Sequence, residues 1–231
     1  MNKKNFSIVI PVLNEENNIL KLINEIHNVF NDQNEFQILI IDDCSIDDTF
    51  KKLSNLNYHN IKVIKNEINM GQSYSIYRGV ENAKYNTIIT MDGDGQNNPK
   101  DLPLLLNHYY KDNNKKIICG IRKNRQDNMF KIFCSKLANN IRNIILNDGC
   151  SDTGCALKVF DKKYLLSIDY FDGLHRFLPA LFKGIDILPV YVDVSHRPRI
   201  YGNSKYGLMN RMFKGIYDIH YVYRVNKKKK K

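Results

Sequence analysis

The chain has 231 residues, of which 43% are hydrophobic, 11% aromatic and 26% charged. This length fits one large domain, and the composition excludes disorder, collagen and a disulfide scaffold for most of the chain. The net charge of +11 is uneven, because residues 196–231 hold 11 of the 35 Lys and Arg residues and one acid, Asp218. One basic end on a nearly neutral chain predicts an anionic partner that meets one face.

Short apolar runs predict strands at residues 6–12, 36–42, 61–64 and 87–91, of which we expect the first, second and fourth to be buried. Apolar residues recur at helical spacing after Asn14, and we expect Asn14 to cap this helix. Ser45 with Asp48 resembles a capping box for the next helix. A third helix is predicted over residues 73–84. Strands that alternate with helices indicate an α/β fold with a mostly parallel sheet flanked by helices.

The second half is less regular. We predict an amphipathic basic helix over residues 128–146, a strand over 187–194, a helix over 208–223 and a solvated lysine tail over 227–231. Apolar residues on one stripe of the last helix, with basic residues elsewhere, favour contact with a membrane surface. Interleaved aromatics at helical spacing and a nearly neutral first half argue against a nucleic-acid partner.

The cysteines indicate a reduced compartment. They are odd in number and form no C-x-x-C pair: Cys44, Cys119, Cys134, Cys150 and Cys155. We expect free thiols in a cytoplasmic protein, several of them buried. The sequence shows no signal peptide and no run of roughly 18–20 apolar residues, so we expect a soluble protein or one peripheral to the membrane.

Polar side chains follow all four strands predicted in the first half. The polar residues are Asn14 and Glu15, then Asp42, Asp43, Ser45 and Asp47, then Asn69, and finally Asp92, Asp94 and Gln96, and they are accompanied by Pro11, Gly71 and Gly93. A single acid at a strand end is usually a helix cap. Four polar strand ends that meet at one edge of a parallel sheet instead favour a ligand site.

The Asp92-Gly93-Asp94 triplet directly follows a predicted buried strand. Two carboxylates one residue apart can share a hard cation, which takes its other ligands from water and substrate phosphate. The triplet therefore predicts Mg²⁺ or Mn²⁺. Zinc is not expected, since no Cys/His cluster has ligand spacing.

Several motifs in order give the chain a family resemblance: IVIPVLNEENNI, IIDDCSIDDT, NMGQSYSIYRGV, MDGDGQ, SDTGCALKVF and HRPRIYGNSKYG. The chain resembles the inverting type-A glycosyltransferases of family 2, and within them the polyprenyl- (dolichyl-) phosphate sugar transferases. The resemblance covers almost the whole chain. It implies a glycosyltransferase domain over residues 1–206, with the amphipathic helix and basic tail over 207–231.

The resemblance also implies roles for individual residues. The nucleotide sugar would contact Pro11, Asn14, Glu15, Asp43, Ser45, Gly71 and Asp92. The metal would be held by Asp92, Asp94 and Gln96, and the acceptor phosphate by Arg122, Arg142, Arg197, Arg199, Ser204 and Lys205. The catalytic residues would be Asp94, Arg122 and Asp172. Gly95 departs from the bulkier apolar residue that is frequent in the lipid-phosphate group.

The activity so implied is transfer of a hexose, mannose or glucose, from GDP-mannose or UDP-glucose to dolichyl or undecaprenyl phosphate at the cytoplasmic membrane face. A phosphate monoester is largely dianionic near neutral pH, so it needs no strong general base. We therefore expect Asp172 to be a positioning residue, paired with Arg176 or His175. The membrane contact would be either peripheral or assisted by an integral-membrane partner.

Two other functions fit the same motifs. One is a family 2 transferase that acts on a saccharide hydroxyl in polysaccharide synthesis. The other is a non-catalytic nucleotide-sugar binding protein, against which the intact acids and Arg122 argue.

Overall fold

The computed structural model describes residues 5–30, 35–112, 115–123, 139–199 and 208–229. Within these residues the strands form one seven-stranded sheet in the order β3-β2-β1-β4-β6-β5-β7. The strands are β1 Phe6–Val12, β2 Phe36–Asp42, β3 Ile61–Lys65, β4 Thr87–Thr90, β5 Lys116–Arg122, β6 Lys158–Asp161 and β7 Leu188–Val194. Neighbouring strands run parallel except at β6, which is antiparallel to both β4 and β5. The expected mostly parallel α/β fold is confirmed.

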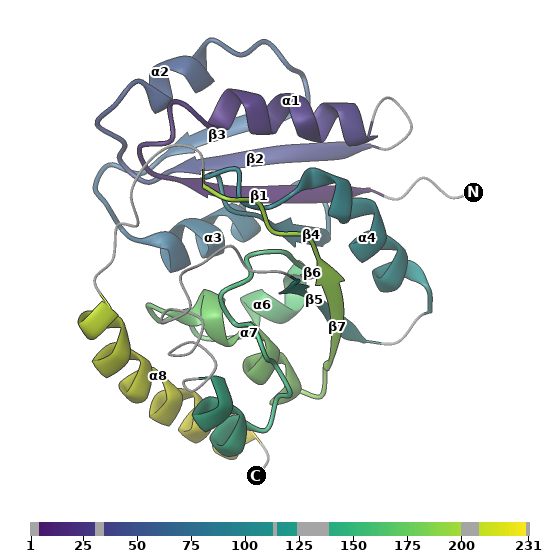
Figure 1. Cartoon of the computed structure of the whole chain (residues 1–231), viewed down its shortest axis with the longest axis vertical. Helices are drawn as coiled ribbons and strands as arrows, with labels where there is room; N and C mark the ends of the chain where they lie inside the picture. Colours follow the sequence, from purple (N-terminus) through teal and green to yellow (C-terminus); the bar gives the residue numbers. More distant parts are fainter. Residues whose placement is uncertain (1–4, 31–34, 113–114, 124–138, 200–207, 230–231) are drawn as a thin grey trace.

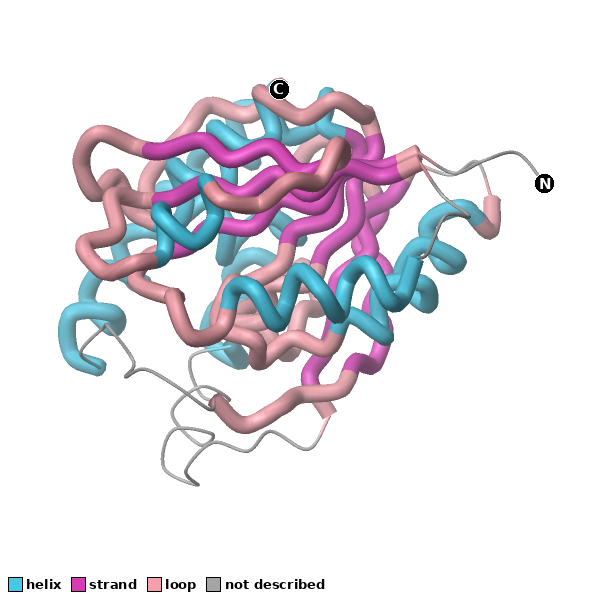
Figure 2. Tube along the Cα trace, turned by 90° about the horizontal axis from the view of Figure 1, so that it is seen from above, coloured by secondary structure: helices cyan, strands magenta, loops and turns pink. Residues whose placement is uncertain are grey.

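Helices cover both faces of this sheet, as Figures 1 and 2 show. They are α1 Ile19–Phe30, α2 Thr49–Ser54, α3 Gln72–Glu81, the 3₁₀ turn η2 Pro99–Asp101, α4 Leu102–Tyr110, α6 Lys162–Leu166, α7 Leu174–Lys183 and α8 Leu208–Lys229. Residues 139–146 are also helical. Apolar residues of α1 and α4 share one core with the strands, and those of α3, α6 and α7 share the other. A sheet buried on both faces explains why its strands read as continuous apolar runs.

The expected helix caps near Asn14 and Ser45 are wrong. Helix α1 begins only at Ile19, and Asn14 has a left-handed backbone with φ of 52°. The Asn14 amide donates to the Ser45 hydroxyl at 2.9 Å, and the Ile46 amide donates to Asn14 Oδ1 at 2.8 Å. These side chains therefore join the loop after β1 to the loop after β2, and Asp48 begins α2 without a side-chain cap.

The sequence analysis does not predict α4, β5, β6, α6 or α7, of which all but α4 lie in the second half of the chain. Of the basic helix expected over residues 128–146, the part over 139–146 is helical, and the rest lies outside the described residues. Helix α8 continues through Lys229, so three lysines of the expected tail are helical. No helix in the described ranges is long and apolar enough to cross a bilayer.

Candidate active site

The carboxyl ends of β1, β2 and β4 bring polar loops together, as expected for parallel strands. The loops after β1 and β2 are joined by Asn14 and Ser45, and the Glu15 amide donates to Thr49 Oγ1 at 2.8 Å. Pro11 lies in β1 opposite Ile41. This edge of the sheet is a preformed arrangement of backbone and side-chain polar groups.

Asp43 organises the turn between β3 and α3. Its carboxylate is nearly buried and accepts hydrogen bonds from Asn66 Nδ2 at 2.7 Å and from the amides of Met70 and Gly71 at 2.9 and 2.8 Å. Gly71 has a φ of 87°, a conformation that L side chains rarely adopt. The carboxylate of Asp43 thus fixes a glycine turn, and a Cβ at Gly71 would lie 4.0 Å from Asp172 Oδ1.

Asp92 and Asp94 lie directly after β4. Asp92 Oδ1 accepts from Gln72 Nε2 at 2.7 Å, and Asp94 Oδ1 accepts from the Gln96 amide at 3.1 Å. Loss of solvation, followed by the charge of Asp94, raises the pKa of Asp92 to about 7. Between the two acids, a Cβ at Gly93 would lie 2.6 Å from a methyl carbon of Val12, so only glycine fits here without a shift.

Arg199 reaches this edge from the segment after β7. Its Nη2 donates to Glu15 Oε1 at 2.8 Å and lies 3.7 Å from Asp94 Oδ2. One guanidinium therefore contacts an acid after β1 and an acid after β4. The residues that precede Arg199 are tied to the same region, since the Arg197 amide donates to the Gln96 carbonyl at 3.0 Å.

Arg197 has a different environment from Arg199. Its guanidinium donates to Glu25 Oε2 at 2.6 Å and to Asn98 Oδ1 at 2.5 Å. These contacts hold the segment after β7 against α1 and the loop before η2. Arg197 therefore holds this segment in place, and its charge is paired with that of Glu25.

Arg122 is held at the end of β5 by Asp152. Arg122 Nε and Nη2 each donate to an oxygen of Asp152 at 2.7 Å, a bidentate ion pair with little exposure. A Cβ at Gly154 would lie 2.8 Å from Arg122 Nη2, so glycine allows the guanidinium to pack there. Asp152 and Gly154 both belong to the SDTGC motif, but the sequence analysis assigns no role to Asp152.

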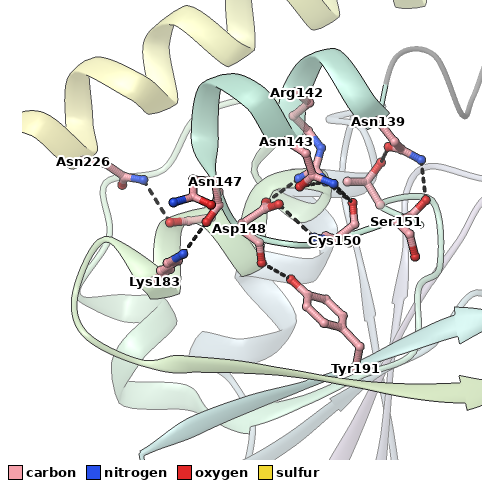
Figure 3. Close-up of polar contacts among 12 residues, drawn as sticks. Asn139, Arg142, Asn143, Asn147, Asp148, Cys150, Ser151, Lys183, Tyr191 and Asn226 are labelled. Carbon is pink, nitrogen blue, oxygen red and sulfur yellow. Dashed lines mark hydrogen bonds and ion pairs between the residues drawn. The ribbon is translucent and has the colours of Figure 1, made fainter.

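Arg142 points toward Asp148 and Cys150, as Figure 3 shows. It is 4% exposed and forms an ion pair with the fully buried Asp148, and its Nη2 donates to the Cys150 carbonyl at 2.5 Å. The expected acceptor residues Ser204 and Lys205 lie outside the described residues.

Asp172 lies in the turn before α7, next to Gly71. Of the residues expected to pair with Asp172, Arg176 donates from Nη2 to Asp218 at 2.6 Å, and His175 Nδ1 lies 2.6 Å from the Ser73 hydroxyl. The Gly173 amide also donates to that hydroxyl at 2.9 Å. The start of α7 is thereby docked on the start of α3.

The acids after β4 suit a hard cation. In the part of the chain that the structure describes, no three His, Cys, Asp or Glu side chains form a metal-binding group. Asp92 and Asp94 would therefore supply two carboxylates, with the Gln96 amide beside them, and leave the other positions to water and phosphate. Mg²⁺ and Mn²⁺ accept such a set, and zinc does not.

Comparison with known proteins relates the chain to sugar transferases. The model of the family described as "Glycosyl transferase family 2" matches residues 7–168. The chain is 29% identical over 222 residues to a dodecaprenyl-phosphate galacturonate synthase of Rhizobium johnstonii, covering 92% of this chain and 64% of that protein. It is also 29% identical over 221 residues to an undecaprenyl-phosphate 4-deoxy-4-formamido-L-arabinose transferase of Klebsiella pneumoniae, covering 94% of this chain and 66% of that protein. The chain therefore spans just under two thirds of these relatives.

Among solved structures, glucosyl-3-phosphoglycerate synthase from Mycobacterium tuberculosis, in complex with Mn²⁺, UDP and glucosyl-3-phosphoglycerate, matches with a TM-score of 0.72. The sequence identity is 14%, and the match covers 96% of this chain and 80% of that one. A complex of the same enzyme with Mn²⁺ and UDP-glucose matches with a TM-score of 0.71, at 15% identity and over 94% of this chain and 79% of that one. At this identity the likeness shows the fold.

Proposed function

Because the chain belongs to glycosyl transferase family 2, we propose that it transfers a sugar from a nucleotide sugar to a polyprenyl phosphate. The names of the two curated relatives support the acceptor, since both contain a polyprenyl phosphate. The sugars in those names differ from each other. We propose a hexose, with GDP-mannose or UDP-glucose as the donor.

The observation that carries the proposal is the group of acids and arginines at one edge of the sheet. Glu15 and Asp94 both contact Arg199, and Asp92 lies beside Asp94. An anionic diphosphate would be repelled by these acids alone. A divalent Mg²⁺ or Mn²⁺ at Asp92 and Asp94 would neutralise the departing diphosphate, and the solved Mn²⁺ complexes of the same fold support that role.

The nucleoside would occupy the loops after β1 and β2. Asn14 and Ser45 hold these loops together, and Asp43 holds the glycine turn that follows β3. Each is engaged by backbone groups, so the pocket would exist before the ligand arrives. Such preorganisation reduces the cost of binding.

The acceptor phosphate would attack the sugar carbon from the side opposite the diphosphate, which inverts the configuration. Arg122, aligned by Asp152, and Arg199 are the described cations we assign to that phosphate. Because the phosphate is already anionic, no side chain needs to remove a proton. Asp172, which lies beside Gly71, would then help to position the substrates and would not act as a base.

A lipid acceptor requires contact with a membrane. We propose that the glycosyltransferase domain over residues 1–206 acts at the cytoplasmic face, with residues 207–231 as a peripheral contact. Basic side chains on α8 support this arrangement, since Arg224, Lys227 and Lys228 are exposed.

The test is transfer of labelled sugar into organic-extractable product. Asp94→Asn should abolish transfer and leave thermal unfolding unchanged, because Asp94 is partly exposed and its hydrogen bond is local. Asp48→Asn, which alters an exposed acid that begins α2, is the matched control and should transfer as the unchanged chain does. Metal-dependent transfer by Asp94→Asn would refute the metal role. Label that stays wholly in water-soluble saccharide would indicate a hydroxyl acceptor instead.

A further inference from the structure

Three consecutive residues at the start of α3 contact three different parts of the candidate site. The Gly71 amide donates to Asp43 Oδ2 at 2.8 Å, and Gln72 Nε2 donates to Asp92 Oδ1 at 2.7 Å. The third residue, Ser73, is 1% exposed and contacts the turn before α7. The acids that we assign to the nucleoside and to the metal are therefore joined, through one turn of helix, to the turn before α7.

Ser73 holds that turn through its hydroxyl group. The Gly173 amide donates to Ser73 Oγ at 2.9 Å, and His175 Nδ1 lies 2.6 Å from the same oxygen. A serine hydroxyl has one donor and two acceptor sites, so it can serve both contacts at once. At the other end of the turn the ring of Tyr170 packs edge-on against Tyr74, with 5.9 Å between the ring centroids. The turn is thus held to α3 at both of its ends.

Helix α8 holds the same turn from another side. Helix α7 contacts both α3 and α8 (Figure 1), and Arg176 Nη2 donates to Asp218 Oδ2 at 2.6 Å. Asp218 is 3% exposed. Gly173 has a φ of 109°, and a Cβ there would lie 2.7 Å from Asp218 Oδ2, so only glycine fits without a shift. The backbone of the turn is therefore fixed by buried polar groups of two helices.

Asp172 is an exposed residue in this fixed turn. Gly173 and Leu174, which follow it, are buried. Asp172 Oδ1 lies 4.0 Å from the position of a Cβ at Gly71, so the carboxylate reaches the edge of the sheet at which the candidate site lies. Buried contacts that fix the backbone beside one exposed carboxylate are the arrangement expected for a binding residue that is positioned before its ligand arrives.

The chemistry of a carboxylate limits what Asp172 can bind. An ionised carboxylate only accepts hydrogen bonds, so its partner must be a donor. The diphosphate of a nucleotide sugar is anionic and offers no donor, and we assign the nucleoside to the loops that Asp43 and Ser45 hold. The transferred sugar is attached to the second phosphate, beyond the metal. Its hydroxyl groups are donors, and they are the part of the ligand that still needs a protein partner.

We propose that Asp172 accepts a hydrogen bond from a hydroxyl group of the transferred sugar, and that Ser73, with His175, is the positioning residue that holds Asp172 there. The proposal deepens the proposed function and rests on it, since it requires a nucleotide sugar as the ligand. It assigns to Asp172 the distinction between a nucleotide sugar and the bare nucleoside diphosphate. That distinction is measurable without transfer.

The test is calorimetry in the presence of Mn²⁺, with GDP-mannose compared with GDP and UDP-glucose compared with UDP. Asp172→Ala should weaken binding of the nucleotide sugar about tenfold, as expected for the loss of one hydrogen bond to a charged group, and leave binding of the matching diphosphate unchanged. The exposed position of Asp172 makes this variant safe for the fold. Asp169→Ala, at an exposed acid three residues earlier, is the matched control and should change neither affinity.

The positioning role is tested on the partners of the turn. Ser73→Ala should weaken binding of the nucleotide sugar about fivefold and leave the diphosphate unchanged, whereas a purely structural role would weaken both. His175→Ala should behave as Ser73→Ala does, and His175→Asn should restore binding, because its amide puts a polar atom where Nδ1 lies. A donor that lacks the contacted hydroxyl should bind the unchanged chain and Asp172→Ala equally weakly, since the two changes remove the same contact.

Equal binding of the nucleotide sugar by Asp172→Ala and by the unchanged chain would overturn the proposal and leave the proposed function intact. Equal losses for the nucleotide sugar and the diphosphate would also overturn it, because Asp172 would then contact the nucleotide. If the unchanged chain bound neither nucleotide sugar, the proposed function would fail together with this proposal.

Discussion

Replacing Arg142 by methionine separates a structural role of this arginine from a role in binding phosphate. The side chains of Arg142 and its partner Asp148 are 4% and 0% exposed. Removing one partner of a buried ion pair costs about 3–5 kcal/mol, because the other charge stays buried without compensation. We therefore expect the free energy of unfolding of Arg142→Met to fall by about 3–5 kcal/mol. For a chain of this size that loss lowers the unfolding midpoint by roughly 10 °C.

The assay is urea unfolding followed by circular dichroism, with thermal unfolding as a second measure. In the control, Arg142→Met is combined with Asp148→Leu, which removes both charges and should restore most of the lost stability. If Arg142→Met unfolds at the same urea concentration as the unchanged chain and yet loses affinity for a prenyl phosphate, the reasoning is refuted. Arg142 would then bind the acceptor, as its place in the sequence suggested.

Four further outcomes follow from the site and the core. Asp152→Asn should lower kcat about a hundredfold, because Arg122 keeps its charge but loses its alignment, and it should also lower the free energy of unfolding by about 3 kcal/mol, because the largely buried guanidinium loses its carboxylate partner. Asp43→Asn should lower the free energy of unfolding by about 2 kcal/mol and weaken nucleotide binding in calorimetry, since an amide cannot accept all three hydrogen bonds. Among the described thiols, a thiol reagent at pH 8 should label Cys44 first, because burial raises the pKa of Cys155 to about 11. For the same reason stability should fall as pH rises from about 8.5, where the unfolded thiol ionises and the folded one does not.

Strands β1, β2 and β4 were predictable because each is buried on both faces and reads as an apolar run. Strand β3 lies at the edge of the sheet and is partly exposed, but its short apolar run was still recognisable. Strands β5 and β6 were missed, and each contains a buried lysine at its start. Lys116 donates to Asp112 at 2.6 Å, and Lys158 donates to the Cys155 carbonyl at 2.5 Å. A lysine suggests exposure, and although the partners lie only four and three residues earlier in the chain, this spacing does not show that the ammonium group is buried there.

The location of the candidate site was predictable, since the polar ends of parallel strands share one edge of the sheet. The contacts made there by individual arginines were not predictable in the same way. Arg122 and Arg199 contact Asp152 and Glu15, acids that are 30 and 184 residues away in the sequence. Spacing cannot show which arginine has such a partner, because the pairing depends on how the chain returns to the sheet.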